Sequence, residues 1–106
     1  MKQRVVIRPA AHADLLDHYV FIGLDSPRMA ERFMLAAQDT FQVLAEMPDI
    51  GTRWLSDHAA LQDVRYYHVE DFPNHLVFYR KVADAVEVLH VFHGARNIDD
   101  LLTPEG

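Results

Sequence analysis

The 106-residue sequence predicts a two-layer α+β fold in which a strand and an antiparallel two-helix hairpin precede a three-stranded antiparallel meander. Three observations predict this fold. A short β-branched run opens the chain, two segments then carry apolar residues at helical spacing, and the second half changes to strand-like composition. We therefore expect one domain over residues 1–106, with residues 94–106 as a tail that docks on a partner or on the sheet.

The first strand is expected at residues 4–8, a β-branched run that ends at Pro9. Proline suits the first turn of a helix, because the N–H group that it lacks has no helical partner there. The apolar residues that follow recur every three or four positions, and they are Ala11, Leu15, Tyr19 and Ile22. This spacing predicts a first helix, which ends before the residues 25–27.

A second helix is expected to follow after about three residues, because Ser26 is a good N-cap and Pro27 a good first helical residue. Its apolar stripe has the same spacing and comprises Ala30, Phe33, Ala37, Phe41 and Leu44. The pattern ends at Met47 and Pro48. Two amphipathic helices with so short a connection predict an antiparallel hairpin.

Three strands are expected in the second half, at residues 61–69, 75–82 and 85–93. Pro73-Asn74 separates the first two, and Ala83-Asp84 is short enough for a tight hairpin. Alternation divides the last strand into two rows: Val86, Val88, His90 and Phe92 on one face, and Glu87, Leu89, Val91 and His93 on the other. Both rows are largely apolar, so we expect the hairpin to cover one face of the sheet and another segment to cover part of the other.

Composition excludes several classes of site. Without cysteine the chain has no disulfide, zinc-thiolate site, iron–sulfur cluster or cysteine nucleophile. Its seven histidines form no paired ligand motif, so neither a metal nor a cofactor is expected. The apolar runs are too short to span a membrane, which predicts a cytoplasmic protein. A net charge of −6 disfavours direct binding to nucleic acid.

Five segments, in order, resemble the ParE/RelE toxins of bacterial type II toxin–antitoxin systems. The segments are residues 8–15 (RPAAHADL), 41–51 (FQVLAEMPDIG), 64–67 (VRYY), 76–80 (LVFYR) and 88–97 (VLHVFHGARN). One departure is His90, which stands where arginine is common in these toxins. The resemblance is strongest to the ParE branch. It implies a toxin that inhibits DNA gyrase without breaking bonds itself, so that no catalytic residues are expected, and that a ParD-like antitoxin wraps and neutralises.

Two alternatives remain open at this point. A RelE-like toxin would cleave mRNA on the ribosome and would need cationic and proton-transferring side chains. For that chemistry the candidates are Arg65, Arg80, His93 and Arg96, if they converge at one end of the sheet. The other alternative is a degenerate member of the family that only binds its antitoxin.

The expected antitoxin surface comprises the helix hairpin and the flanking sheet edge. Its candidate residues are Phe21, Met29, Phe33, Met34, Trp54, Arg65 and Arg80, with the arginines facing acidic side chains of the antitoxin. Phe72 is a further large residue outside the predicted stripes. In the alternative interpretation the apolar residues complete the core, and the two arginines pair with Asp63, Asp71 or Asp84.

Overall fold

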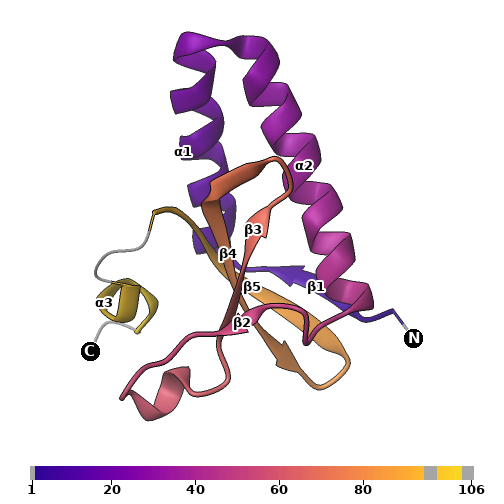
Figure 1. Ribbon diagram of the computed structural model, residues 1–106, viewed down its shortest axis with the longest axis vertical. Helices are drawn as coiled ribbons and strands as arrows, with labels where there is room; N and C mark the ends of the chain where they lie inside the picture. Colours follow the sequence, from indigo (N-terminus) through magenta and orange to yellow (C-terminus); the bar gives the residue numbers. More distant parts are fainter. Residues whose placement is uncertain (1, 95–97, 104–106) are drawn as a thin grey trace.

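The computed structural model describes residues 2–94 and 98–103. Figure 1 shows two long helices beside a twisted sheet, with a short helix near the C-terminal end of the chain. The elements in chain order are β1 (Arg4–Ile7), α1 (Pro9–Asp25), α2 (Pro27–Glu46), β2 (Thr52–Arg53), a 3₁₀ turn (Ala59–Leu61), β3 (Arg65–Val69), β4 (Phe72–Val82), β5 (Ala85–His93) and α3 (Ile98–Leu102). The predicted α+β class is confirmed.

The strands form one sheet in the order β1-β5-β4-β3-β2. Strands β3, β4 and β5 are the predicted antiparallel meander, and β1 joins it as a parallel neighbour of β5. The first meander strand begins at Arg65 and not at residue 61 as predicted, because Leu61 ends a 3₁₀ turn. The prediction missed the two-residue strand β2, which pairs with the start of β3. It also separated the first two meander strands at the wrong place, because β4 already begins at Phe72 and the turn lies at Glu70-Asp71.

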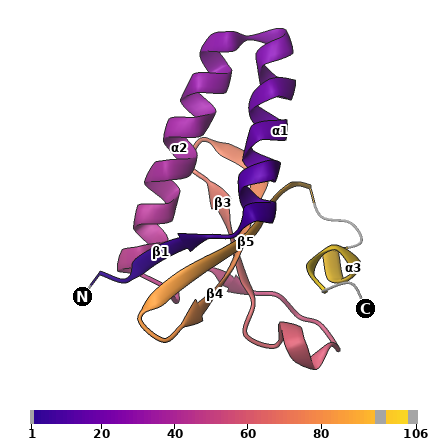
Figure 2. The ribbon, with the colours of Figure 1, turned by 180° about the vertical axis from the view of Figure 1, so that it is seen from behind.

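The helix hairpin forms as predicted and extends beyond the sheet (Figures 1 and 2). Pro9 occupies the first turn of α1, and Pro27 that of α2. Ser26 caps α2 by accepting a hydrogen bond of 3.2 Å from the backbone N–H of Met29. One face of the hairpin packs on the sheet, and the main core lies between them. Its buried residues are Ala11, Leu15, Phe33, Ala37, Phe41, Leu44, Val69, Val77, Tyr79, Val86, Val88 and Val91.

A β-bulge in β5 changes which side chains face the helices. Phe78 pairs with His90 and Tyr79 pairs with Val88, so Leu89 is an extra residue between them. Val91 therefore points to the helix side together with Val88, whereas Phe92 packs on the opposite side. The predicted strict alternation of β5 is wrong from this point onward, because a bulge reverses the pattern.

The second face of the sheet is partly covered, as expected, by the segment before β3 and by α3. The buried residues there are Leu61, Val64, Phe78, Leu89 and Ile98, and Trp54, Tyr66, Leu76, Phe92 and Leu102 pack around them. Residues 98–102 of the tail thus lie on the sheet, one of the two positions considered for them. None of the helices in the described ranges is long and apolar enough to cross a membrane.

Candidate interaction surfaces

Arg65 forms hydrogen bonds with the loop that follows α2. Its guanidinium donates hydrogen bonds to the backbone carbonyls of Gly51, at 2.7 Å, and Asp49, at 3.3 Å. The loop is held a second time by Tyr79, whose hydroxyl donates to the carbonyl of Pro48 and accepts from the N–H of Gly51. A Cβ atom on residue 51 would lie 2.5 Å from that hydroxyl, which explains why glycine stands there.

Arg80 lies on the opposite face of the sheet from Arg65. Arg65 is the cross-strand partner of Tyr79, the residue before Arg80, and successive residues of a strand point to opposite faces. The Arg80 guanidinium lies 3.6 Å from the Glu87 carboxylate and 3.8 Å from that of Asp63. Pairing with Asp63 was one of the predicted alternatives. The charge of Arg80 is therefore already compensated within the chain.

His93 lies toward the other end of the sheet, where it is the cross-strand partner of His75. On β4, His75 lies four positions before Tyr79, the partner of Arg65, which corresponds to about 13 Å along the strand. Arg65, Arg80 and His93 therefore do not converge at one end of the sheet, as the RelE-like alternative would require. Arg96 lies outside the described residues.

Three histidine rings cluster between α1 and the sheet. The ring centroid of His75 lies 4.9 Å from that of His18 and 4.6 Å from that of His93. Partial burial, together with repulsion from the other two imidazoles when they are charged, lowers the pKa of His75 to about 4. The His75 ring is therefore neutral at pH 7. Among the residues that the structure describes, no group of three or more histidines and carboxylates is placed to hold a metal ion.

Two polar side chains of α1 attach the helix to β5. The carboxylate of Asp14 accepts from the backbone N–H of Val91 at 2.9 Å and from Nδ1 of His90 at 2.7 Å. One turn later His18 places Nε2 at 2.7 Å from the carbonyl of Val91. A carbonyl can only accept, so Nε2 carries the proton. Sequence reasoning missed this attachment, although both residues lie on the sheet-facing side of the predicted helix.

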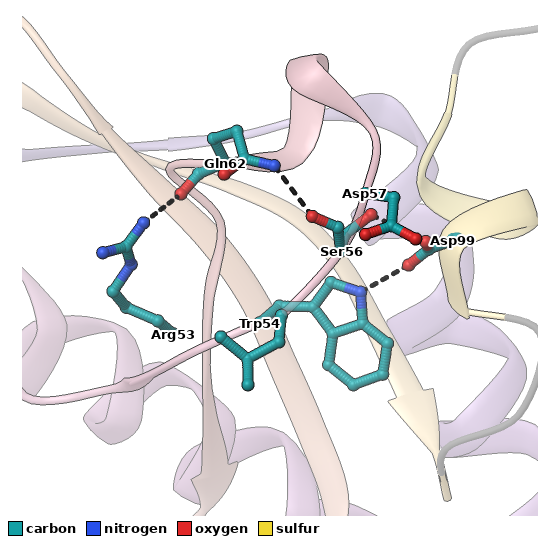
Figure 3. A pocket seen from close by; sticks show the side chains of 7 residues that line it. Arg53, Trp54, Ser56, Asp57, Gln62 and Asp99 are labelled. Atoms are coloured by element: carbon teal, nitrogen blue, oxygen red, sulfur yellow. Dashed lines mark hydrogen bonds between the residues drawn. The ribbon is translucent and has the colours of Figure 1, made fainter.

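Trp54 belongs to the second face of the sheet and not to the hairpin. Its ring packs edge-on against Tyr66 and Phe78, and its indole N–H donates to the Asp99 carboxylate of α3. Figure 3 shows this contact at the rim of a pocket, and Ser56 donates to the same carboxylate at 2.6 Å. The hydrogen bonds from Ser56 and Trp54 lower the pKa of Asp99. Trp54 thus fixes the tail and does not extend the predicted hairpin surface.

The hairpin residues predicted to contact an antitoxin differ in how exposed they are to solvent. Phe21 is 73% exposed, and Met29, in the first turn of α2, is also exposed. Met34 is half-buried against the main core. Phe33 is fully buried, so this residue lies in the core and not on the expected surface. Phe72, the further large residue, packs edge-on against the Phe33 ring.

Comparisons with known proteins find similarities that span most of the chain. Residues 5–98 match the model of the family described as ParE toxin of type II toxin-antitoxin system, parDE. Among solved structures, a chain of the chromosomal ParDE TA system from P. aeruginosa superposes with a TM-score of 0.70 at 17% identity, covering 89% of this chain and 98% of that one. The curated proteins give no significant match. Because the family match spans most of the sequence, this chain belongs to the ParE toxin family of type II toxin–antitoxin systems.

Proposed function

We propose that the chain is a toxin that inhibits DNA gyrase in the cytoplasm without breaking bonds itself, and that a ParD-type antitoxin neutralises it. The observation that carries this proposal is the family match over residues 5–98. A gyrase inhibitor of this kind acts through a surface, and a net charge of −6 is no obstacle to binding a protein.

The positions of the candidate nuclease residues also support a role without catalysis. Phosphodiester cleavage needs groups that take and give protons beside cations that stabilise the developing charge, all within reach of one phosphate. Arg65 and Arg80 lie on opposite faces of the sheet, and His93 lies several residues along the sheet from both. Each arginine is also bonded to groups of its own chain. These three residues therefore do not assemble one phosphate-cleaving centre.

A paired assay tests the proposal. Purified chain is added to gyrase with supercoiled DNA and, separately, to ribosomes programmed with mRNA. We expect cleaved DNA to accumulate and the mRNA to remain intact, and we expect added antitoxin to abolish the effect. Cut mRNA with unaffected gyrase would contradict the proposal and favour the RelE-like alternative. No effect on either target would favour the degenerate alternative.

Substitutions distinguish the mechanisms further. For a gyrase inhibitor, His93→Ala is expected to retain activity, because this exposed side chain contributes no chemistry. For a nuclease, the same change would abolish cleavage while leaving the circular dichroism spectrum unchanged. Arg65→Ala is the less informative variant, since losing the bonds to Asp49 and Gly51 also loosens the loop after α2.

A further inference from the structure

Helix α3 is too short to persist away from the sheet. It comprises the five residues Ile98–Leu102, little more than one helical turn. An isolated helix needs about 12–15 residues to be even marginally stable in water, because its first turn loses more chain entropy than its few hydrogen bonds offset. One of these bonds joins the backbone N–H of Thr103 to the carbonyl of Asp99 at 3.0 Å. The folding of α3 and its docking on the sheet are therefore one event.

The apolar anchor of α3 on the second face of the sheet is small. Of its five described residues only Ile98 is buried, and Leu102 packs half-buried against the same cluster. A cavity of about 320 Å³ remains between the last residues of α3 and Leu89 of β5, and another of about 300 Å³ borders Asp99. Well-packed interiors leave few voids larger than a water molecule. The contact of α3 with the sheet is therefore incomplete at both ends of the helix.

A single carboxylate supplies the polar anchor. Asp99 accepts hydrogen bonds from the indole N–H of Trp54 and from the hydroxyl of Ser56 (Figure 3). The neighbouring Asp100 is exposed, and its carboxylate makes no such bond within the described part of the chain. Two bonds to a charged acceptor and two aliphatic contacts are comparable in free energy to the entropy lost when five residues become ordered. Helix α3 is therefore held by a small margin.

We propose that α3 is a reversible strap, which leaves the sheet by local unfolding while the rest of the fold persists, with the Asp99 carboxylate as its latch. Elements with few buried contacts are the ones that open locally in folded proteins. Release of α3 frees the indole of Trp54 and uncovers apolar side chains of the sheet, among them Leu89 and Phe92. The strap thus sets how often this apolar face is open to solvent or to another protein, whether or not the chain inhibits gyrase.

Hydrogen exchange of the full-length chain, followed by NMR, tests the strap. Trp54 is the one tryptophan of the sequence, so its indole N–H gives one signal. We expect this N–H and the backbone N–H of Thr103 to exchange through an opening that does not respond to low urea concentrations, because local release exposes little surface. The backbone N–H groups that join β4 to β5 are expected to exchange only through global unfolding, with a strong dependence on urea.

A substitution at one anchor is expected to change the exchange rate at the other. Leu102→Ala should speed exchange of the Trp54 indole N–H about fivefold or more, because it weakens the apolar contact without touching the acceptor of that N–H. Asp99→Ala should speed exchange of the Thr103 backbone N–H about tenfold or more, because it removes the acceptor of both latch bonds.

The neighbouring residues provide the matched controls. Leu101→Ala and Asp100→Ala change exposed side chains of the same helix and are expected to leave both rates unchanged. Equal effects of the controls and of the anchor variants would overturn the strap. So would an indole rate that Leu102→Ala leaves unchanged, because the two anchors would then not release together. Equal acceleration in β4 and β5, or one urea dependence shared by α3 and the sheet, would show that α3 opens only with the whole fold and would also overturn the proposal.

Discussion

The two long helices lie side by side in one hairpin but differ in what they leave exposed. The outward face of α2 is polar, and Leu35, 62% exposed, is an isolated apolar residue between charged and amide neighbours. The outward face of α1 carries the continuous row of Leu16, Val20 and Leu24 instead. A helix that serves only the core needs one apolar stripe, as α2 has. The second stripe of α1 therefore indicates a task beyond folding.

The helices also differ in how they are held. Seven residues of α2 are buried, including the aromatic rings of Phe33 and Phe41, whereas α1 buries only Ala11 and Leu15. Helix α1 compensates with polar contacts, in which side chains of Asp14 and His18 bond the backbone of β5. Helix α2 thus makes most of the buried contacts of the hairpin, whereas α1 leaves an apolar row exposed.

The difference in burial between α1 and α2 predicts its largest effect on the free energy of unfolding. Phe33→Ala in α2 is expected to lower the free energy of unfolding by about 3–5 kcal/mol, because it leaves a cavity in a fully buried site. Leu24→Ala in α1, where the side chain is 81% exposed, is expected to change it by less than about 0.5 kcal/mol. Urea denaturation followed by circular dichroism measures both. Similar losses in the two variants would remove the contrast between the helices.

A smaller effect is expected from the polar attachment of α1. Asp14→Ala removes the acceptor for the Val91 N–H and for His90, and we expect a loss of about 1–3 kcal/mol in the free energy of unfolding. Asp17→Ala, on the same helix but exposed and without an ion pair among the described residues, serves as the control and is expected to stay within about 0.5 kcal/mol. Equal stability of the two variants would show that α1 does not depend on its bonds to β5.

The smallest stability effect expected depends on pH. The pKa of His75 is about 4 in the folded chain and about 6.5 when unfolded, so the unfolded state binds the proton more readily. This contribution is fully present above pH 6.5 and is lost as the pH falls toward 4. We expect a loss of at most about 2 kcal/mol, because solvent reaches part of the ring. His75→Gln should flatten the stability profile between those pH values, and an unchanged profile would show that the histidine cluster is not its source.

Local signals in the sequence predicted the helix hairpin well. Pro9, Ser26 and Pro27 act at helix starts through backbone chemistry that depends on few distant residues, and Ala83-Asp84 forms the predicted tight turn. The start of β4 was misplaced, because the chain already reverses at Glu70-Asp71, where Asp71 adopts a positive φ of 69°. Pro73 was expected to lie between two strands, but it lies inside β4. The register between β3 and β4 shifts there, and Pro73 has no partner residue on β3.

The arrangement of the candidate sites depended on features that the sequence pattern does not carry. The bulge at Leu89 reverses the faces of β5, and no alternation rule indicates where a strand gains an extra residue. From its position in the sequence, Phe33 could be either a core residue or a surface contact for the antitoxin. Only the packing in the structure, where its side chain is fully buried, distinguishes these two roles. The outward row of α1 was visible in the sequence, but its exposure became clear once the sheet-facing side of the helix was known.

The measurement that tests the division between the helices most directly is the labelling of introduced cysteines. The chain has no cysteine, so the variants Leu24→Cys in α1 and Leu35→Cys in α2 each report on one outward face. Each variant is treated with a thiol reagent, alone and in complex with the antitoxin. We predict that the antitoxin slows labelling of the α1 variant about tenfold or more and leaves that of the α2 variant unchanged. Protection of the α2 variant alone, or equal labelling of both in the complex, would contradict the account.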